Sequence, residues 1–360
     1  MKIVHHSNQL GMGGTEKCMQ YLLEYLKGAG HDCYCMHNRR ATEASGGYRE
    51  ALISETLGAG RVISYGSEEE FFSLLSSIRP DTFHAHRSGR PEFPLVPRIR
   101  EFTSRIVETN VFGGRDPDGP IDMTLYVNRY LRSSGRWIMR LKHVLYNPVK
   151  RPTCGRDLRG VLGIQPGTFV MGRIGRPDDH IFDPISLQAL KELEAAGLED
   201  ILYLAQSPPP LMVRAAAEMG LKRIMFLKRP VVRDEEISAF YNTLDVLAHS
   251  RRDGETFGLN IAEAMIHGKP VVSHFSRFAN GHAGFVHVCG FLAQADDHTA
   301  YAGYLRRLYD DRDLAARLGA RGRGYAEENF LLEKLGAELE VFYSELWSAA
   351  PAWRKLGWLV

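Results

Sequence analysis

Short apolar strands alternate with amphipathic helices along the chain, and this alternation restricts the fold more than any other feature. Residues 2–6 form an expected strand, and the glycine-bearing turn 11–14 follows it. Leu22 and Leu26 then stand at helical spacing, with a second expected strand at 33–36. A strand, a glycine turn, a helix and another strand are the opening of a Rossmann-like unit, in which helices cover both faces of a parallel sheet.

The alternation continues to about residue 150 and then begins again. Residues 149–160 are rich in Pro, Gly and Arg, and we expect a hinge there. We therefore predict two doubly wound α/β domains, residues 1–150 and 151–340, followed by a final helix at about 340–360. Further strands are expected at 61–64, 82–86, 105–109, 169–173, 201–205, 224–226, 246–250 and 270–274.

Composition argues against several classes of protein. The 360 residues carry 45 Lys and Arg against 43 Asp and Glu, a formal charge of +2, which does not suit a dedicated nucleic-acid-binding protein. No window of 18 residues is uninterruptedly apolar, and the polar start does not suit a signal peptide. Five cysteines, an odd number in a long chain, favour a reducing compartment. These features predict a cytoplasmic enzyme or binding protein.

The most informative stretch runs from residue 255 to residue 272. Residues 259–267 are expected to form a short helix, and Gly268 stands where a left-handed residue ends such a helix. Glu255 lies in the loop before this helix and Glu263 lies on it. The stretch therefore places two carboxylates around a helix N-terminus.

This arrangement suits a phosphorylated sugar ligand. Backbone amides near Phe257 and Gly258 lie at the positive end of the helix dipole, a favourable place for a diphosphate. The Glu263 carboxylate can accept hydrogen bonds from the two vicinal hydroxyls of a ribose, and Glu255 can do the same for a hexose. The alternative is a capped helix with two solvated glutamates.

Seven residues separate Glu255 from Glu263, and the stretch resembles the E-x7-E signature of retaining GT-B glycosyltransferases, glycosyltransferase family 4 in particular. The resemblance implies two Rossmann-like domains facing a central cleft, the first for the acceptor and the second for the nucleotide sugar. It also implies a last helix that crosses back to the first domain. Further similar motifs are Gly13-Gly14-Thr15-Glu16, His84-Ala85-His86, Gly172-Arg173-Ile174-Gly175-Arg176 and the closing segment 308–319.

The resemblance implies roles for individual residues. Glu255 would contact the donor sugar near the reacting centre, Glu263 would hold the ribose, and Arg173 would neutralise the diphosphate. The other implied contacts with the donor come from Gly13, Gly14 and His86 (less so His84), and from Thr256, Phe257, Gly258 and Leu259 at the helix start.

One position departs from the family. A Lys usually follows the arginine by a few residues and gives the diphosphate a second cation, but residues 173–180 contain none. Arg176, His180 or Lys228 would have to replace it.

On this basis we predict a metal-independent retaining glycosyltransferase without a cofactor. It would move a sugar from a nucleotide-diphosphate donor to a hydroxyl acceptor, in surface glycan or glycolipid synthesis. The alternatives are a nucleotide-sugar epimerase or phosphorylase of GT-B fold, and a non-catalytic nucleotide-sugar-binding protein.

Residues 11–14 also allow a dinucleotide interpretation. The third glycine of that fingerprint is replaced by Glu16, and no acidic residue ends the second strand. Only Arg39 and Arg40 would suit NADP, through its 2′-phosphate.

Asp116-Pro117-Asp118 has a spacing that could chelate a divalent cation. The surrounding glycines and prolines favour a simple turn instead, and we expect no metal site.

Two stretches mix basic and aromatic residues, at 129–142 and 347–358. Either could lie on an anionic bilayer as a peripheral contact. The favoured interpretation is an amphipathic helix packed on its own domain.

Overall fold

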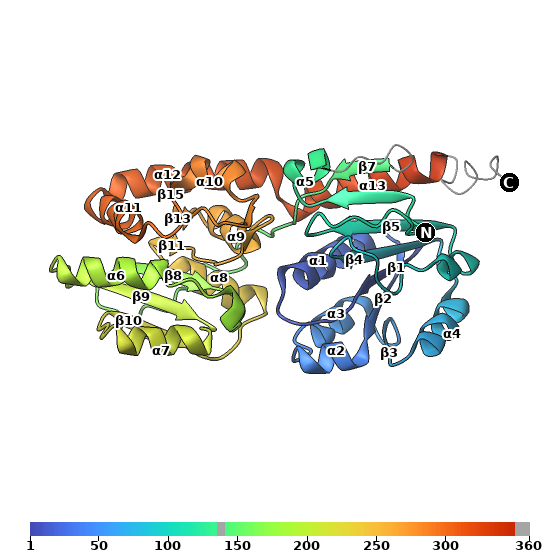
Figure 1. The fold of residues 1–360 in the computed structure, drawn as a ribbon, viewed down its shortest axis with the longest axis horizontal. Helices are drawn as coiled ribbons and strands as arrows, with labels where there is room; N and C mark the ends of the chain where they lie inside the picture. Colours follow the sequence, from blue (N-terminus) through green and yellow to red (C-terminus); the bar gives the residue numbers. More distant parts are fainter. Residues whose placement is uncertain (135–140, 350–360) are drawn as a thin grey trace. The chain divides into compact units, whose positions relative to one another are not determined.

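The structure is a computed structural model that describes residues 1–134 and 141–349. The chain forms two compact units. Unit 1 comprises Met1–Pro148 together with the chain from Leu332 onward, and unit 2 comprises Val149–Leu331. Each is an α/β unit with its own parallel sheet (Figure 1).

Unit 1 is built on a sheet of seven parallel strands in the order β3-β2-β1-β4-β5-β6-β7. One face carries a core formed with α1, α3 and α13, and the other carries a core formed with α4. The strands are β1 Lys2–Ser7, β2 Asp32–Asn38, β3 Val62–Tyr65, β4 Thr82–Arg87, β5 Arg105–Asn110, β6 Met123–Tyr126 and β7 Leu141–Val144. The helices are α1 Gly14–Gly28, α2 Arg39–Ala44, α3 Glu50–Leu57, α4 Glu68–Ile78, the 3-10 turn η1 Pro97–Glu101, α5 Arg129–Ser134 and α13 Leu332–Ser348.

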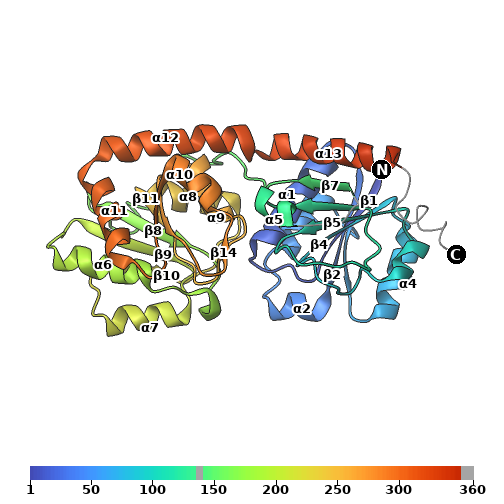
Figure 2. The ribbon, with the colours of Figure 1, turned by 45° about the horizontal axis from the view of Figure 1, so that its top comes forward.

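Helix α13 returns the end of the described chain to unit 1, where it packs beside α1 (Figure 2). Leu335, Leu339, Tyr343 and Leu346 recur at helical spacing and are buried in the core that Met19 and its neighbours form. The helix begins at Leu332, and these apolar residues form one continuous stripe along it. The boundary between the units therefore lies at 331/332 and not at the expected residue 340.

Unit 2 is built on a sheet of six parallel strands in the order β10-β9-β8-β11-β13-β15, with a small pair β12-β14 beside it. The strands are β8 Phe169–Ile174, β9 Ile201–Gln206, β10 Ile224–Leu227, β11 Val246–Ala248, β12 Gly254–Glu255, β13 Val271–His274, β14 Ala279–Asn280 and β15 Gly290–Ala293. The helices are the 3-10 turn η2 Asp179–Ile181, α6 Ile185–Ala195, α7 Pro210–Glu218, α8 Asp234–Thr243, α9 Leu259–Ile266, α10 Ala283–Cys289, α11 His298–Asp310 and α12 Arg312–Asn329.

The predicted doubly wound α/β fold is confirmed in both units. Every strand expected from the sequence is present, with ends shifted by one or two residues. Strands β6, β7 and β15 were not expected, nor was the small pair β12-β14. Within residues 1–134 and 141–349, no helix is long and apolar enough to cross a membrane.

The expectation of one amphipathic helix over 129–142 is wrong. Helix α5 ends at Ser134, and Leu141–Val144 pairs in parallel with β6 as the last strand of the sheet. Arg136, Trp137, Ile138 and Arg140 lie outside the described residues, as do the basic and aromatic residues at 353–358.

Candidate functional site

The loop before α9 lies at the carboxyl edge of the unit 2 sheet and is fixed by its glycine cap and by the packing of a buried phenylalanine. Gly258 caps α9 with a φ of 91°, a left-handed conformation that favours glycine. Phe257 is buried against Phe285 and Phe330. The first amides of α9 therefore lie beside a fixed loop, and amides at that end of a helix favour an anion.

Glu255 lies in β12 with its side chain 15% exposed. Its Oε1 is 3.4 Å from Nε2 of His249 and 3.6 Å from a guanidinium nitrogen of Arg251. Burial by itself raises the pKa of Glu255, but the hydrogen bond from His249 and the charge of Arg251 outweigh it, so the pKa lies below the usual value. Glu255 is thus an ionised acceptor at neutral pH.

Glu263 lies on α9 and is 9% exposed. Its Oε2 is 3.0 Å from the hydroxyl of Tyr241, which is also 2.8 Å from the carbonyl oxygen of Asn260. Neither this glutamate nor Glu255 is a solvated surface residue, so the alternative of a capped helix with two solvated glutamates does not describe the site. As expected, Gly268 follows the helix in a left-handed conformation.

Arg173 is the last but one residue of β8, at the same edge of the sheet. The residue is 8% exposed, and its guanidinium lies 3.5 Å from the carbonyl oxygen of Ser207. Burial lowers the pKa of Arg173, and the nearby charge of Arg251 lowers it further. Strand β8 pairs with β11, which His249 directly follows, so Arg173 and the histidine that contacts Glu255 lie at one edge of the six-stranded sheet, with Glu255 in the small pair β12-β14.

The three candidates for the second cation are placed differently. Arg176 lies in the loop after β8, 3.5 Å from a carboxylate oxygen of Asp178. His180 is exposed in η2. Lys228 is exposed after β10, two strands away from β8, or roughly 10 Å at the usual spacing between strands. Arg176 is the candidate nearest to Arg173 in the sequence, three residues beyond it.

The glycine turn of unit 1 opens α1. Gly13 caps the helix in an extended conformation, and Gly14 is its exposed first residue. A Cβ at Gly13 would overlap Oε2 of Glu16, so a larger residue there would require the Glu16 side chain to move. Arg39, the residue that would suit NADP, pairs with Glu70 at 2.8 Å.

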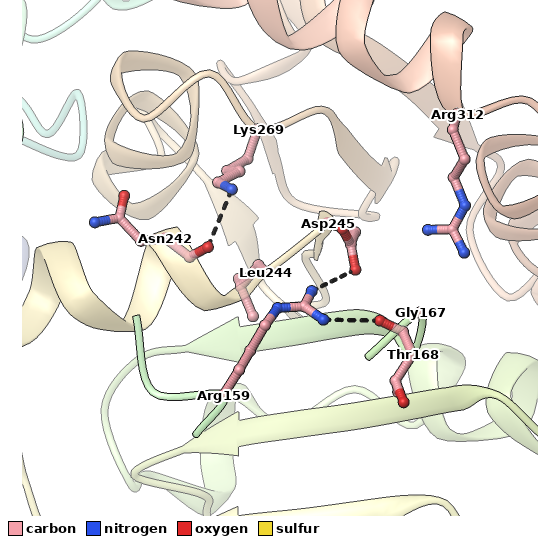
Figure 3. A pocket seen from close by; sticks show the side chains of 8 residues that line it. All are labelled: Arg159, Gly167, Thr168, Asn242, Leu244, Asp245, Lys269 and Arg312. Carbon is pink, nitrogen blue, oxygen red and sulfur yellow. Dashed lines mark hydrogen bonds and ion pairs between the residues drawn. The ribbon is translucent and has the colours of Figure 1, made fainter. Parts of the chain in front are cut away.

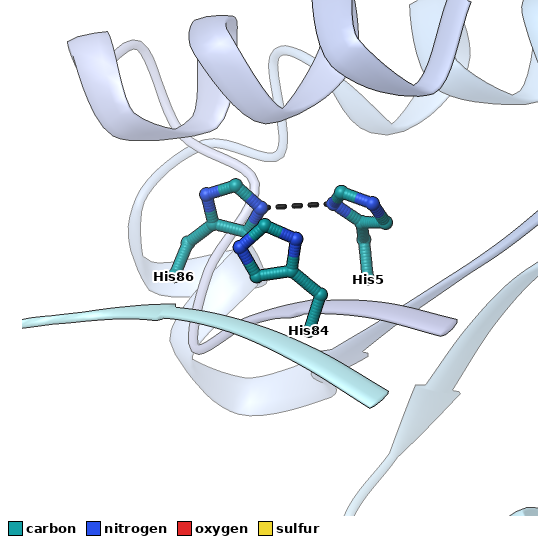
Figure 4. A group of neighbouring side chains, drawn as sticks. All are labelled: His5, His84 and His86. Atoms are coloured by element: carbon teal, nitrogen blue, oxygen red, sulfur yellow. Dashed lines mark hydrogen bonds between the residues drawn. The ribbon is translucent and has the colours of Figure 1, made fainter. Parts of the chain in front are cut away.

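His86 lies at the end of β4 beside two further histidines (Figure 4). Its Nε2 is 2.9 Å from Nδ1 of His5, and the ring of His84 stacks on it with a centroid distance of 4.6 Å. Burial lowers the pKa of His86 to about 3, so the ring is neutral at pH 7. His84 is fully buried, whereas His86 is 4% exposed. This difference favours His86 over His84 as the residue that meets a ligand.

The segment with D-x-D spacing does not bring its two carboxylates together. Asp116 is buried and accepts a 2.7 Å hydrogen bond from Arg87, while Asp118 is exposed. The ion pair with Arg87 gives Asp116 a structural role in the turn.

A cavity of about 510 Å³ lies at the opposite, amino-terminal edge of the unit 2 sheet (Figure 3). Most of its lining residues lie shortly before β8, β11 or β13, and Arg159 there pairs with Asp245 at 2.8 Å. The cavity contains none of the predicted site residues. It is lined by Arg159, Gly167, Thr168, Asn242, Leu244, Asp245, Lys269 and Arg312.

Several residues that support the site were not anticipated. His249 contacts Glu255 and is held by Ser273 at 2.8 Å, and Tyr241 contacts Glu263. The position of His249 at a strand end was the only signal in the sequence, because Ser273 and Tyr241 reach the site through tertiary contacts.

Comparison with known proteins agrees with this picture. Residues 212–325 match the family of glycosyl transferases group 1. A stretch of 124 residues is 32% identical to the D-inositol 3-phosphate glycosyltransferase of Streptomyces avermitilis, covering 33% of this chain and 25% of that protein. The chain thus spans about a quarter of the length of the curated relative that it matches.

Solved structures resemble the whole described chain. HepE of Anabaena, in complex with UDP and glucose, superimposes with a TM-score of 0.75 at 18% identity and covers 96% of this chain and 100% of that one. Sucrose-phosphate synthase of Thermosynechococcus elongatus gives a TM-score of 0.72 at 16% identity, covering 97% and 100%. At these identities the likeness shows the fold, which is the GT-B fold expected from the sequence.

Proposed function

We propose that the protein is a glycosyltransferase that takes its sugar from a nucleoside-diphosphate donor bound at the carboxyl edge of the unit 2 sheet. The observation that carries this proposal is the pair of carboxylates on either side of the N-terminus of α9, the half-buried Glu255 and the buried Glu263. Both residues lie within the stretch that matches glycosyl transferases group 1.

The parts of the donor meet different groups of this site. The Glu263 carboxylate accepts hydrogen bonds from the ribose hydroxyls. The diphosphate meets the amides at the start of α9 and the guanidinium of Arg173, with Arg176 as the second cation. Glu255, which stays ionised beside His249, accepts hydrogen bonds from the hydroxyls of the transferred sugar.

Transfer breaks the bond between the anomeric carbon and the diphosphate oxygen, and a bond to the acceptor hydroxyl replaces it. Negative charge grows on the leaving phosphate, where Arg173 and the helix dipole stabilise it without a metal ion. The hydroxyl proton passes to the leaving phosphate oxygen. Retention of configuration follows if the acceptor attacks from the side that the phosphate leaves.

A UDP-sugar is the first donor to test, since the HepE structures contain UDP, glucose and UDP-glucose. The acceptor is a hydroxyl of a glycan or glycolipid in surface glycan synthesis, and His86 contacts a hydroxyl-bearing part of the substrates. The proposal includes a cytoplasmic location, and a peripheral membrane contact would bring a lipid-linked acceptor within reach.

The test is a screen of UDP-, GDP-, ADP- and dTDP-sugars by thermal shift, followed by product analysis with the donor that binds. A glycosylated acceptor with the anomeric configuration of the donor supports the proposal. An altered free nucleotide sugar indicates an epimerase, and binding without any product indicates a binding protein. Glu263→Ala should abolish the donor-dependent shift, whereas Glu218→Ala, on the exposed end of α7, should keep it.

A further inference from the structure

The histidine cluster of unit 1 has features that the proposed reaction does not explain. His5 on β1 is the register partner of His84 on β4, and His86 follows two residues later on the same face of the sheet. All three are buried, and burial lowers the pKa of each ring, so all three are neutral at pH 7. Three neutral imidazoles in one place are either metal ligands or members of a hydrogen-bond chain.

The ring geometry favours a hydrogen-bond chain. One nitrogen from each ring lies within 4.8 Å of the others, which is close enough for a shared ion. The rings of His84 and His86, however, are stacked with only 17° between their planes. Since the lone pair of an imidazole nitrogen lies in the ring plane, two stacked rings aim their lone pairs side by side and not at one point.

The hydrogen bonds connect all three rings to two hydroxyl groups. Thr109 on β5 lies 2.7 Å from Nε2 of His84, and Nδ1 of His84 lies 2.8 Å from the hydroxyl of Tyr343 on α13. That hydroxyl is 3.3 Å from Nε2 of His5, and Nδ1 of His5 is 2.9 Å from Nε2 of His86. The chain therefore runs from Thr109 through His84, Tyr343 and His5 to His86, with its last bond drawn in Figure 4.

Which group donates in each of these hydrogen bonds follows from the position of the Thr109 hydroxyl hydrogen. Within residues 1–134 and 141–349, Nε2 of His84 is the one hydrogen-bond partner of the Thr109 hydroxyl, and we assign the hydroxyl hydrogen to this bond because a buried hydroxyl donates where it has a partner. A neutral imidazole carries one hydrogen, and that of His84 must then be on Nδ1, from which it donates to Tyr343. Tyr343 in turn donates to Nε2 of His5, and Nδ1 of His5 donates to Nε2 of His86.

We propose that Thr109 and Tyr343 are positioning residues that fix His86 as the tautomer with its hydrogen on Nδ1. His86 then offers a permanent hydrogen-bond donor, and the ligand group that it recognises is an oxygen that accepts. In the described part of the protein no hydrogen bond reaches Nδ1 of His86. This atom is also not one of the fully buried polar atoms that lack a hydrogen-bond partner. The tautomer of His86 does not depend on the proposed function. The contact of His86 with a carbohydrate or phosphate oxygen does rest on the proposed function.

The experiment reads the tautomer directly in the ligand-free protein. With ¹⁵N-labelled histidine, long-range ¹H–¹⁵N spectra distinguish the protonated from the unprotonated ring nitrogen, and the His86 signals are assigned by their loss in His86→Gln. In the wild type we expect Nδ1 of His86 to be protonated. In Tyr343→Phe and in Thr109→Val we expect a mixture of tautomers at His86, because each variant removes one hydroxyl of the chain.

Two matched controls separate the relay from general packing. Thr109→Ser keeps the hydroxyl and should keep the wild-type tautomer. Tyr25→Phe removes a 3.0 Å hydrogen bond to Glu340 of α13 but none of the hydrogen bonds between Thr109 and His86, and should also keep the wild-type tautomer. Thermal unfolding identifies any variant that fails to fold, in which case the remaining variant decides.

A wild-type His86 protonated on Nε2, or an unchanged tautomer in both Thr109→Val and Tyr343→Phe, would overturn the proposal. A second measurement addresses the ligand: loss of one neutral hydrogen bond should weaken donor or acceptor binding by roughly 3- to 10-fold in Tyr343→Phe but not in Tyr25→Phe. If the tautomer changes and both affinities stay the same, the relay stands and the contact assigned to His86 under the proposed function is refuted.

Discussion

Replacement of Glu263 by glutamine tests the donor site most directly, because it changes charge while it keeps the shape of the side chain. The buried carboxylate has to accept from ribose hydroxyls, and hydrogen bonds to a charged group are worth about 1.5–3 kcal/mol. Loss of that charge should therefore weaken UDP binding by about 10- to 150-fold. The amide oxygen of glutamine can still accept one neutral hydrogen bond, which favours the lower end of this range.

The substitution should leave the fold intact. The Tyr241 hydroxyl, which lies 3.0 Å from Oε2 of Glu263, retains the carbonyl oxygen of Asn260 at 2.8 Å as an acceptor. No buried donor is orphaned, so the free energy of unfolding should fall by about 1 kcal/mol or less. Glu218→Gln, on the exposed end of α7, controls for the charge change alone.

Isothermal titration calorimetry with UDP and with 2′,3′-dideoxy-UDP makes the test specific. Loss of the ribose hydroxyls should weaken binding to the wild type strongly and to Glu263→Gln only slightly, because their partner is already impaired. If both proteins lose the same free energy between the two nucleotides, Glu263 does not hold the ribose and the assignment is refuted.

Three further predictions concern neighbouring groups. Glu255→Gln should lower turnover, measured by product formation, far more than UDP affinity, measured by calorimetry. Equal losses of turnover and affinity would indicate that Glu255 only binds the donor. Arg173→Met should weaken UDP binding at least 10-fold and leave uridine binding unchanged, since only the diphosphate needs the cation; a similar loss for uridine would contradict this. His86 has a folded pKa of about 3 against a reference value of 6.5, so its contribution to stability is complete above pH 6.5 and is lost as the pH falls below it. At pH 5.5 this loss is about 1.4 kcal/mol, and urea unfolding of His86→Asn should be less sensitive to the change from pH 7.5 to 5.5 than the wild type. Equal sensitivity would show that this ring does not titrate as described.

The long strands of both sheets could be predicted because each is a buried apolar run between turn residues. Strands β6, β7 and β15 have four residues each and were missed, whereas β3, β10 and β13 are equally short and were predicted, so length alone does not decide the outcome. In the region of β7 the spacing of apolar and basic residues favoured a helix instead. What made Leu141–Val144 a strand is its pairing with β6, a long-range contact that no local pattern contains.

The same distinction applies to the site. Glu255 and Arg173 could be selected because each stands near the end of a strand, and such ends meet at one edge of a parallel sheet. Glu263 could be selected by its spacing from Glu255 on the following helix. The partners that set their charge and orientation could not be selected. His249 reaches Glu255 within six residues, but Ser273 and Tyr241 depend on how β11, β13, α8 and α9 pack.

The return of α13 to unit 1 also bears on the order in which the nascent chain matures. The first 148 residues emerge from the ribosome without the helix whose leucines complete their core, and all of unit 2 must be synthesised before that helix appears. Until then the apolar strip on α1 and the neighbouring strands stays open to water or to chaperones, while unit 2 can already bury its own core. Unit 1 is therefore finished last although it is begun first, and Tyr343 reaches His5 and His84 only at that final step.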